Sequence, residues 1–258
     1  MSRASGVTVT PGDWPAEAVV GEWDALARRT SAPHYLRPGW FGPWYEAFSP
    51  ESALVLQARR AEELVGVLPL VERRGVVASA SNGHSPCFAP LAADPETLEA
   101  LLAAARERAR RRLDLLYVDG EDPARQQLVA PGGGRTIERV IARSPYIDLE
   151  GDWAAFEAAL PSKRRSDMRR RHRKLEEAGT VEIADVTESD RIGELLAEGW
   201  SVEAKGWKGE GGTAVAAGAA TSLFYERIAA WAMAEGLLAA GVQPVVKHAP
   251  GHGRACVD

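Results

Sequence analysis

Three segments typical of β-strands lie so close together that they limit the fold more than any other feature of the chain. They cover residues 53–58, 63–71 and 76–80, and the middle one reads ELVGVLPLV. Apolar and β-branched residues favour strands. The connections between the segments are too short to hold a crossover helix, so neighbouring strands must run in opposite directions. The sequence therefore predicts an antiparallel meander at the centre of the fold.

Further elements flank this meander. Residues 7–10 form a short β-type segment, and a helix is expected from residue 13 or 14 to Arg29. Residues 95–112 carry an apolar stripe at helical spacing, and the apolar segment DLLYV follows at 114–118. A strand, a helix and a further strand in this order indicate a parallel crossover. We predict an α/β fold with a mixed, largely antiparallel sheet flanked by helices.

The segment at residues 32–48, APHYLRPGWFGPWYEAF, concentrates aromatic side chains among three prolines. Large aromatic groups bury much apolar surface and are found mostly in protein cores. We therefore predict that six of them belong to the core: Tyr35, Trp40, Phe41, Trp44, Tyr45 and Phe48.

The order of elements begins again after a boundary near residues 145–150. Residues 136–149 are predicted as a strand pair and 153–160 as a helix, with a strand at 180–186 and a helix that Thr187 caps. This order predicts two related α/β domains in tandem. The first covers residues 1–145 and the second, a partial one, covers residues 146–236. Residues 237–258 form an irregular tail without a hydrophobic period.

Residues 160–179, LPSKRRSDMRRRHRKLEEAG, read as a strongly basic helix. We expect Ser162 to cap its start and Gly179 to follow its end. Met168, His172 and Leu175 recur at i, i+4 and i+7 and form the one face that could be buried. The positive charges are either a solvated surface or a surface for phosphates of a CoA-type cofactor or of nucleic acid. Both interpretations stay open.

Composition excludes several classes of protein. The chain has 258 residues, 45% of them hydrophobic, and a net charge of −5, which argues against a general nucleic-acid coat. Two cysteines are too few for a disulfide framework or a zinc site, and His248 and His252 lack nearby acidic partners. No apolar run reaches the roughly 20 residues of a membrane span. We expect a cytoplasmic protein without a metal.

The segment WSVEAKGWKGEGGT, at residues 200–213, carries a resemblance to a known family. Together with PLVERRG, SKRRSDMRRR and AGAATSLFYERIAAWA, it resembles the CelD-like branch of the GNAT acyltransferase superfamily, a relative of the FemABX peptidyltransferases. The resemblance runs from about Trp23 to Gly236. It implies two GNAT-like domains in tandem and transfer of an acyl group from acetyl-CoA or another acyl-CoA to an amine. The acceptor implied is a small molecule or a glycan precursor of the cell envelope.

Two features depart from the GNAT pattern. Acetyl-CoA-binding GNAT domains carry a Q/R-x-x-G-x-G/A turn whose backbone N–H groups hold the pyrophosphate. The corresponding connection here, residues 82–87, lacks this pattern and contains Pro86, which has no N–H to donate. In the second half the chain ends before such a turn, so we expect a truncated or frame-shifted, incomplete second domain with impaired activity.

The acceptor side of the reaction has candidate residues in the second half. Glu203 is the candidate catalytic residue, because a carboxylate could position an amine. The alternative is a helix-end carboxylate paired with Lys205 or Lys208. Six further residues are candidate substrate-binding groups: Lys205, Trp207, Lys208, Arg165, Arg169 and Arg173. His84 is either a base or a solvated loop histidine.

Two other functions stay open. The basic helix could bind nucleic acid or tRNA, as in a FemABX-type transferase that uses aminoacyl-tRNA, and such binding would weaken steeply with salt. The chain could also be a non-catalytic remnant whose exposed apolar helix faces promote association.

Overall fold

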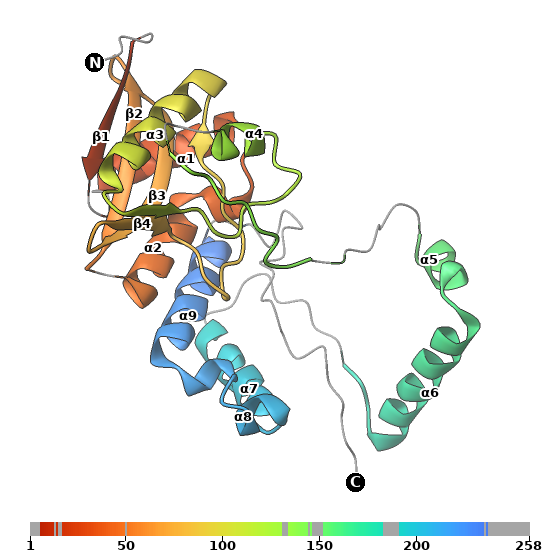
Figure 1. Ribbon diagram of the computed structural model, residues 1–258. Helices are drawn as coiled ribbons and strands as arrows, with labels where there is room; N and C mark the ends of the chain where they lie inside the picture. Colours follow the sequence, from red (N-terminus) through yellow and green to blue (C-terminus); the bar gives the residue numbers. More distant parts are fainter. Residues whose placement is uncertain are drawn as a thin grey trace. The chain divides into compact units, whose positions relative to one another are not determined.

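The computed structural model describes residues 6–12, 14, 17–49, 51–130, 134–143, 145, 152–182, 191–234 and 236 (Figure 1). The chain divides into two compact units. The first unit joins residues 1–138 to residues 187–258, and the second consists of residues 139–186. The helices that follow residue 191 therefore share a unit with the central sheet. The tandem arrangement with domains at 1–145 and 146–236 stays a prediction.

A mixed sheet forms the centre of the first unit. Its strands are β1 (Val7–Gly12), β2 (Ala53–Arg60), β3 (Glu63–Arg73), β4 (Val76–Ser79), β5 (Leu91–Ala92) and β6 (Arg112–Asp114). The order across the sheet is β1-β2-β3-β4-β6, and β5 pairs with β3. All pairs are antiparallel except β4 with β6, which is parallel. The predicted meander, the parallel crossover and the mixed, mostly antiparallel sheet are confirmed.

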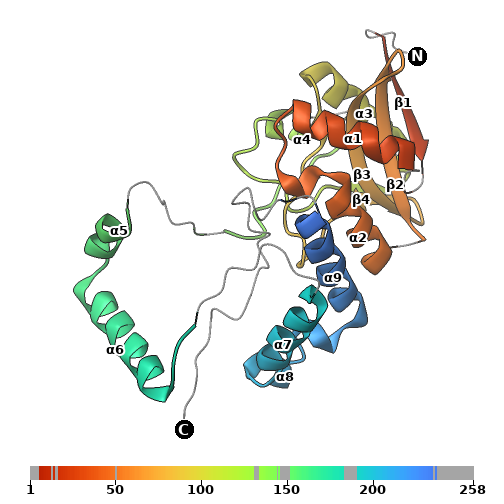
Figure 2. The same ribbon diagram turned by 180° about the vertical axis from the view of Figure 1, so that it is seen from behind.

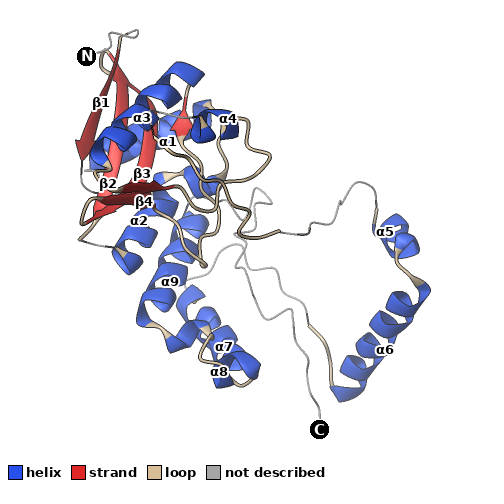
Figure 3. Ribbon diagram, in the orientation of Figure 1, coloured by secondary structure: helices blue, strands red, loops and turns tan. Residues whose placement is uncertain are grey.

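The described part of the first unit also contains helices. They are α1 (Glu17–Arg29), α2 (Pro38–Phe48), α3 (Pro95–Arg108), α4 (Arg125–Val129), α7 (Ile192–Ala204), α8 (Trp207–Glu210) and α9 (Ala219–Ala234), with short 3₁₀ helices η1 (His34–Leu36) and η2 (Val215–Ala217). The helix α3 lies on one face (Figure 1) and α1 on the other (Figure 2). The helix α9 packs along α2 (Figure 3). No helix in the described part of the chain is long and apolar enough to cross a membrane.

The aromatic segment at residues 32–48 belongs to the core, as predicted. Trp40, Phe41, Trp44 and Tyr45 are buried, and Tyr35 and Phe48 pack against them. The segment forms η1 and α2, whose first residue is Pro38, a position where the missing N–H of proline costs nothing. This apolar cluster lies between the sheet and the helices α1, α2 and α9, so the core itself ties α9 to the first half of the chain.

The docking of α9 on α2 depends on a close approach near the start of α2. A Cβ atom at Gly39 would collide with the indole of Trp231. Next to it, the buried guanidinium of Arg37 lies 5.2 Å from the centre of the Trp231 ring and donates a hydrogen bond of 2.6 Å to Asp24. A cation over an indole face is attracted by the ring quadrupole. These contacts fix the end of α9 against α1 and α2.

Asp94 caps the N-terminus of α3, the helix on the sheet face opposite α1. Its substitution tests how much this cap stabilises the fold. The Asp94 carboxylate accepts a hydrogen bond of 2.8 Å from the backbone N–H of Thr97, and this bond, with Arg60 nearby, lowers the pKa of Asp94. We expect Asp94→Ala to cost about 1 kcal/mol in urea denaturation at pH 7. A lowered pKa in the folded state means that this stabilisation is present above the unfolded pKa near 3.8 and is lost at lower pH. A cost that persists undiminished at pH 2 would contradict the role of the charge.

Several predicted strands differ from the structure. The strand predicted at 114–118 lies earlier, at β6, because the Ser79 hydroxyl accepts a hydrogen bond of 2.9 Å from the backbone N–H of Leu116 and replaces a strand partner there. The helix predicted at 95–112 ends at Arg108. Residues 136–143 are exposed and form no strand, since no neighbouring strand pairs with them among the described residues. Residues 146–150, Thr187 and the tail from 237 lie outside the described residues.

The second unit contains two helices, α5 (Trp153–Ala159) and α6 (Ser162–Ala178). Both were predicted. Ser162 is the first residue of α6 and not its cap; Pro161 precedes the helix, and no side chain caps it. Arg165 links the two helices, because it donates hydrogen bonds to the carbonyl oxygens of Ala158 at 2.9 Å and Leu160 at 2.5 Å. Residues 180–182 form no strand, and 183–186 lie outside the described residues.

Candidate functional site

Glu203, the candidate catalytic residue, lies at the end of α7 with only 5% of its side chain exposed. Both carboxylate oxygens accept hydrogen bonds from the chain. Oε1 accepts one of 2.5 Å from Nζ of Lys208, and Oε2 accepts one of 2.8 Å from the backbone N–H of Val215. Of the two pairings expected for Glu203, the structure forms the one with Lys208. A direct contact with an acceptor amine would have to displace or share these bonds.

This carboxylate organises the turn between α7 and η2. The carbonyl oxygen of Lys208 accepts hydrogen bonds from the N–H groups of Thr213 at 2.8 Å and Ala214 at 3.1 Å. A Cβ atom at Gly209 would collide with the carbonyl oxygen of Ala204, so α8 can lie this close to α7 only with glycine there. The turn is therefore a fixed structure, with the Glu203 ion pair at its base.

Lys205 and Trp207 lie on the outside of the same turn. Lys205 is exposed, and Trp207 is 64% exposed, far more than the core tryptophans. The ammonium group of Lys208 lies 6.0 Å from the centre of the Trp207 ring, at the limit of a cation–π contact. The structure thus brings Lys205, Trp207, Lys208 and Glu203 together, with the first two available to a ligand.

A second group of polar side chains lies where α9 meets the turn that follows β4. Nδ1 of His84 is 3.5 Å from the Tyr225 hydroxyl, and its Nε2 is 3.5 Å from the Thr221 hydroxyl. The imidazole also stacks on Phe48, with the ring centres 5.8 Å apart. Burial, followed by the negative charge of Glu203, raises the pKa of Tyr225. His84 is thus a partly buried residue of an aromatic site and not a solvated loop histidine.

Sequence reasoning missed Thr221 and Tyr225 as members of this group. Their spacing of four residues puts both on one face of α9, which was a usable signal. The partner of that face, His84, comes from a turn more than a hundred residues earlier, and no local pattern connects the two.

The arginines Arg165, Arg169 and Arg173 lie on α6, in the second unit, whereas Glu203 belongs to the first. Their spacing of four residues places them along one side of the helix. Arg165 binds backbone carbonyl groups of α5 and its flank, and Arg169 pairs with Glu157 at 3.2 Å. Arg173 is exposed.

Comparison with known proteins identifies the segment that contains α6 to α9. Residues 162–242 match the family model of the acetyltransferase (GNAT) domain. This match supports membership of the GNAT superfamily for that segment. The chain matches no curated protein and no solved structure. The matched GNAT segment includes Glu203 and the six candidate substrate-binding residues, whereas His84 lies outside it.

The first half has a mixed, mostly antiparallel sheet that is consistent with a GNAT fold, and its parallel pair is formed by β4 and β6. A GNAT domain usually receives the thioester carbonyl at a backbone donor on a splayed strand. Here the pairing of the two strands ends at Ala78 and Asp114, and the hydroxyl groups of Ser79 and Ser81 contact the carbonyl oxygen of Leu116 at 3.3 Å.

Phe88 forms an isolated parallel bridge with Val118, after the end of β6. Its backbone N–H donates a hydrogen bond of 3.0 Å to Tyr117, and its side chain is 2% exposed.

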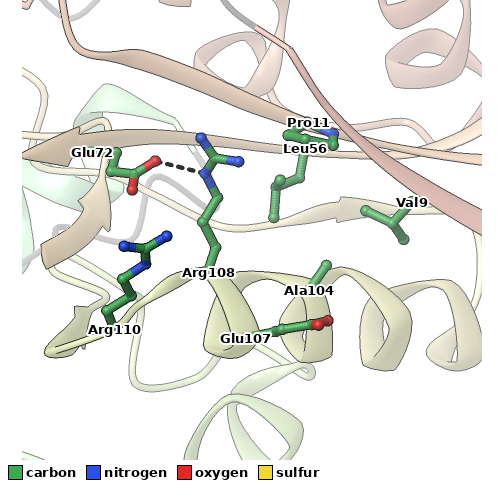
Figure 4. A pocket seen from close by; sticks show the side chains of 8 residues that line it. All are labelled: Val9, Pro11, Leu56, Glu72, Ala104, Glu107, Arg108 and Arg110. Atoms are coloured by element: carbon green, nitrogen blue, oxygen red, sulfur yellow. Dashed lines mark hydrogen bonds and ion pairs between the residues drawn. The ribbon is translucent and has the colours of Figure 1, made fainter. Parts of the chain in front are cut away.

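A hollow on the described surface lies elsewhere, on the α3 face of the sheet (Figure 4). Its volume is about 400 Å³, and an ion pair of 2.6 Å between Glu72 and Arg108 lies at its edge. A neighbouring hollow of about 340 Å³ shares these two residues. None of the candidate site residues lines either hollow. Among the described residues, no three His, Cys, Asp or Glu side chains gather in a way that could hold a metal ion.

Proposed function

We propose that this chain is an N-acyltransferase that transfers an acyl group from acyl-CoA, such as acetyl-CoA, to an amine. The observation that carries the proposal is the GNAT domain match at residues 162–242, which contains the fixed turn around Glu203. The acceptor that we propose is a small molecule or a glycan-precursor amine, as in the CelD-like and FemABX-like proteins that the sequence resembles. A tandem of GNAT-like domains is part of the same proposal.

The reaction needs a neutral amine at the thioester carbonyl. The amine nitrogen forms a bond to the carbonyl carbon, the carbon–sulfur bond breaks, and CoA leaves as the thiol after it takes up a proton. The ammonium form of the acceptor has to lose its proton first, because only the free amine is a nucleophile. We assign the acceptor to the turn at residues 203–213, with Lys205 and Trp207 as the exposed contacts.

Glu203 acts in this proposal by positioning the turn through Lys208 and the N–H of Val215. Arg165, Arg169 and Arg173 are the proposed contacts for the anionic part of the substrate, because guanidinium groups bind phosphates in a two-point geometry.

Calorimetric titration of the purified chain with acetyl-CoA and with CoA, at low and moderate salt, tests the proposal. We expect saturable binding to about one site, weakened roughly tenfold by Arg169→Ala because a charge-assisted hydrogen bond to a phosphate is lost. Arg110→Ala, which removes an exposed arginine from the first unit, is the matched control and should leave binding unchanged. A folded chain that binds neither compound would rule out the proposed donor.

A further inference from the structure

The two edges of the sheet differ in how well they are protected against pairing with another strand. The strand order β1-β2-β3-β4-β6 leaves β1 at one edge and β6 at the other. The strand β6 has only three residues and carries Arg112 and Asp114, which form an ion pair of 2.7 Å. A short, charged edge strand is a poor template for another chain. The edge at β6 is therefore protected.

The strand β1 lacks the protection that shortness and charge give to β6. It has six residues, VTVTPG, and none of them is charged. Its register with β2 runs through all six positions without a bulge. Figures 1 and 2 show β1 at the outer margin of the sheet, and no described strand pairs with its outer side. Valine and threonine favour strands, so this edge is a template for a further strand.

The hydrogen bonds of the sheet show in which direction the backbone groups of β1 point. The backbone N–H of Glu72 donates a hydrogen bond of 2.9 Å to the carbonyl oxygen of Ser52, so Ser52 faces β3. Bonding direction alternates along a strand, and Gln57 lies an odd number of positions further on, so it faces β1. Gln57 lies opposite Thr10. The backbone groups of Thr10 therefore bond to β2.

The same alternation turns the N–H and C=O groups of Val7 and Val9 away from the sheet. Pro11 shares their direction, and its missing N–H costs no bond to β2 there. The side chains alternate as well. Val7 and Val9 pack against the apolar cluster that contains the buried residues of α3, whereas Thr8 and Thr10 are exposed. The open edge thus consists of the outward backbone groups of two valines.

This row of backbone groups is complementary to itself when two copies of β1 run antiparallel. In the register that places Val7 opposite Val9 of a second copy, the two residues exchange both of their N–H···O=C bonds, and the twofold axis repeats the pair. The axis then passes between the two Thr8 residues. A register with Val9 opposite Val9 would instead set Val7 opposite Pro11, which has no N–H to donate. The first register leaves no outward group of the valines unpaired.

The side chains also fit this register. Residues directly opposite each other lie on the same face of a sheet. Val7 would therefore lie beside Val9 of the second copy on the α3 side, where both valines are only half-buried in the single chain. The two Thr8 side chains would meet on the other face, and such threonine pairs stabilise strand pairing. No like charges are brought together.

We propose that β1 is an interaction surface for a second copy of this chain, and that the two β1 strands pair antiparallel and join the two sheets into one. The same patch serves both copies, so the assembly closes at a dimer, and the protected edge at β6 does not extend it. The contact is confined to one strand and its flanks, so the dimer is a weak one that depends on concentration. This proposal is independent of acyl transfer, since β1 lies outside the GNAT match.

Sedimentation velocity of the full chain between about 1 and about 500 µM tests the proposal. We expect the average mass to rise from the monomer mass of 27.8 kDa toward twice that value and not beyond it. Hydrogen exchange measured by mass spectrometry on peptides that cover β1 supplies a second readout. The amides of Val7 and Val9 should exchange slowly only at the high concentration, because only the dimer gives them a hydrogen-bond partner.

Substitutions at Thr8 test the register. Thr8→Lys should weaken self-association at least about fivefold, because like charges then lie directly opposite each other, and Thr8→Glu should do the same. An equimolar mixture of the two variants should associate again, since lysine then faces glutamate across the axis. Ser201→Lys, which adds the same charge at an exposed position of α7, is the matched control and should leave self-association unchanged. Thr8 is exposed, so the urea midpoint of each variant should equal that of the unchanged chain.

Several results would overturn the proposal. They are a monomer across the whole concentration range, a mass that grows beyond the dimer, association that both Thr8 variants leave intact, and a mixture that associates no better than its components. Slow exchange of the Val7 and Val9 amides at about 1 µM, in a chain that is monomeric there, would mean that another segment of the same chain covers the edge.

Discussion

Glu203→Gln is expected to lower the free energy of unfolding by about 3–5 kcal/mol, because it removes one partner of a buried ion pair. The side chains of Glu203 and Lys208 are only 5% and 12% exposed. The amide oxygen of glutamine could still accept the hydrogen bond from Val215, but the ammonium group of Lys208 would lose its ion pair with the Glu203 carboxylate. Urea denaturation followed by circular dichroism measures the change as a lower transition midpoint.

Two further variants show whether the ion pair is the cause. Glu210→Gln changes an exposed glutamate on the same turn and should cost less than about 0.5 kcal/mol. The double variant Glu203→Gln/Lys208→Met removes both charges and should regain a large part of the loss, because a pair replaced as a whole leaves no buried charge behind. If Glu203→Gln costs no more than Glu210→Gln, the carboxylate is not a structural partner and its role as a catalytic residue becomes the better interpretation.

The sheet was the most predictable part of the fold. The strands β2, β3 and β4 follow one another with short connections, so neighbours in sequence are neighbours in space. The helices α3 and α6 were also predicted, because a helix is marked by its own period of apolar or charged residues. Such features depend on residues within one or two turns of each other, and a single sequence contains them.

The ends of elements depend on contacts that the sequence does not display. The apolar segment DLLYV was expected to be a strand, yet β6 ends at Asp114. The reason is that the backbone N–H of Leu116 donates its hydrogen bond to the Ser79 hydroxyl and not to a neighbouring strand. The hydroxyl of a serine that lies more than thirty residues earlier decides this boundary. Hydrophobicity alone favoured a longer strand.

The candidate site shows the same limit. The sequence brought Glu203, Lys205, Trp207 and Lys208 together because they are close in the chain, but it could not choose between the two lysines as partner of Glu203. Lys208 forms the ion pair with Glu203 because the turn into α8 brings its side chain back to the end of α7. The contact of His84 with Tyr225 depends on the docking of α9 on α2 and was beyond any local pattern.

Trp40→Ala is expected to destabilise the first unit by about 3–5 kcal/mol, the usual cost of truncating a buried tryptophan to alanine. The indole of Trp40 joins three parts of the chain. It packs edge-on against Phe224 of α9 at 5.8 Å between ring centres, contacts His34 at 5.4 Å, and donates a hydrogen bond of 2.8 Å to the Ser85 hydroxyl. Its loss leaves a cavity and a buried hydroxyl without its donor.

The same substitution tests whether α9, which lies inside the GNAT match, depends on the first half for its structure. If it does, Trp40→Ala lowers the urea midpoint and also speeds proteolysis within α9, since a helix that loses its packing partner opens locally more often. Trp207→Ala is the matched control, because this tryptophan is 64% exposed and the change should cost less than about 0.5 kcal/mol. A loss of stability in Trp40→Ala without faster cleavage in α9 would mean that Phe224 and Trp231 hold the helix without Trp40. The GNAT segment would then be a more independent partner of the sheet than its shared core indicates.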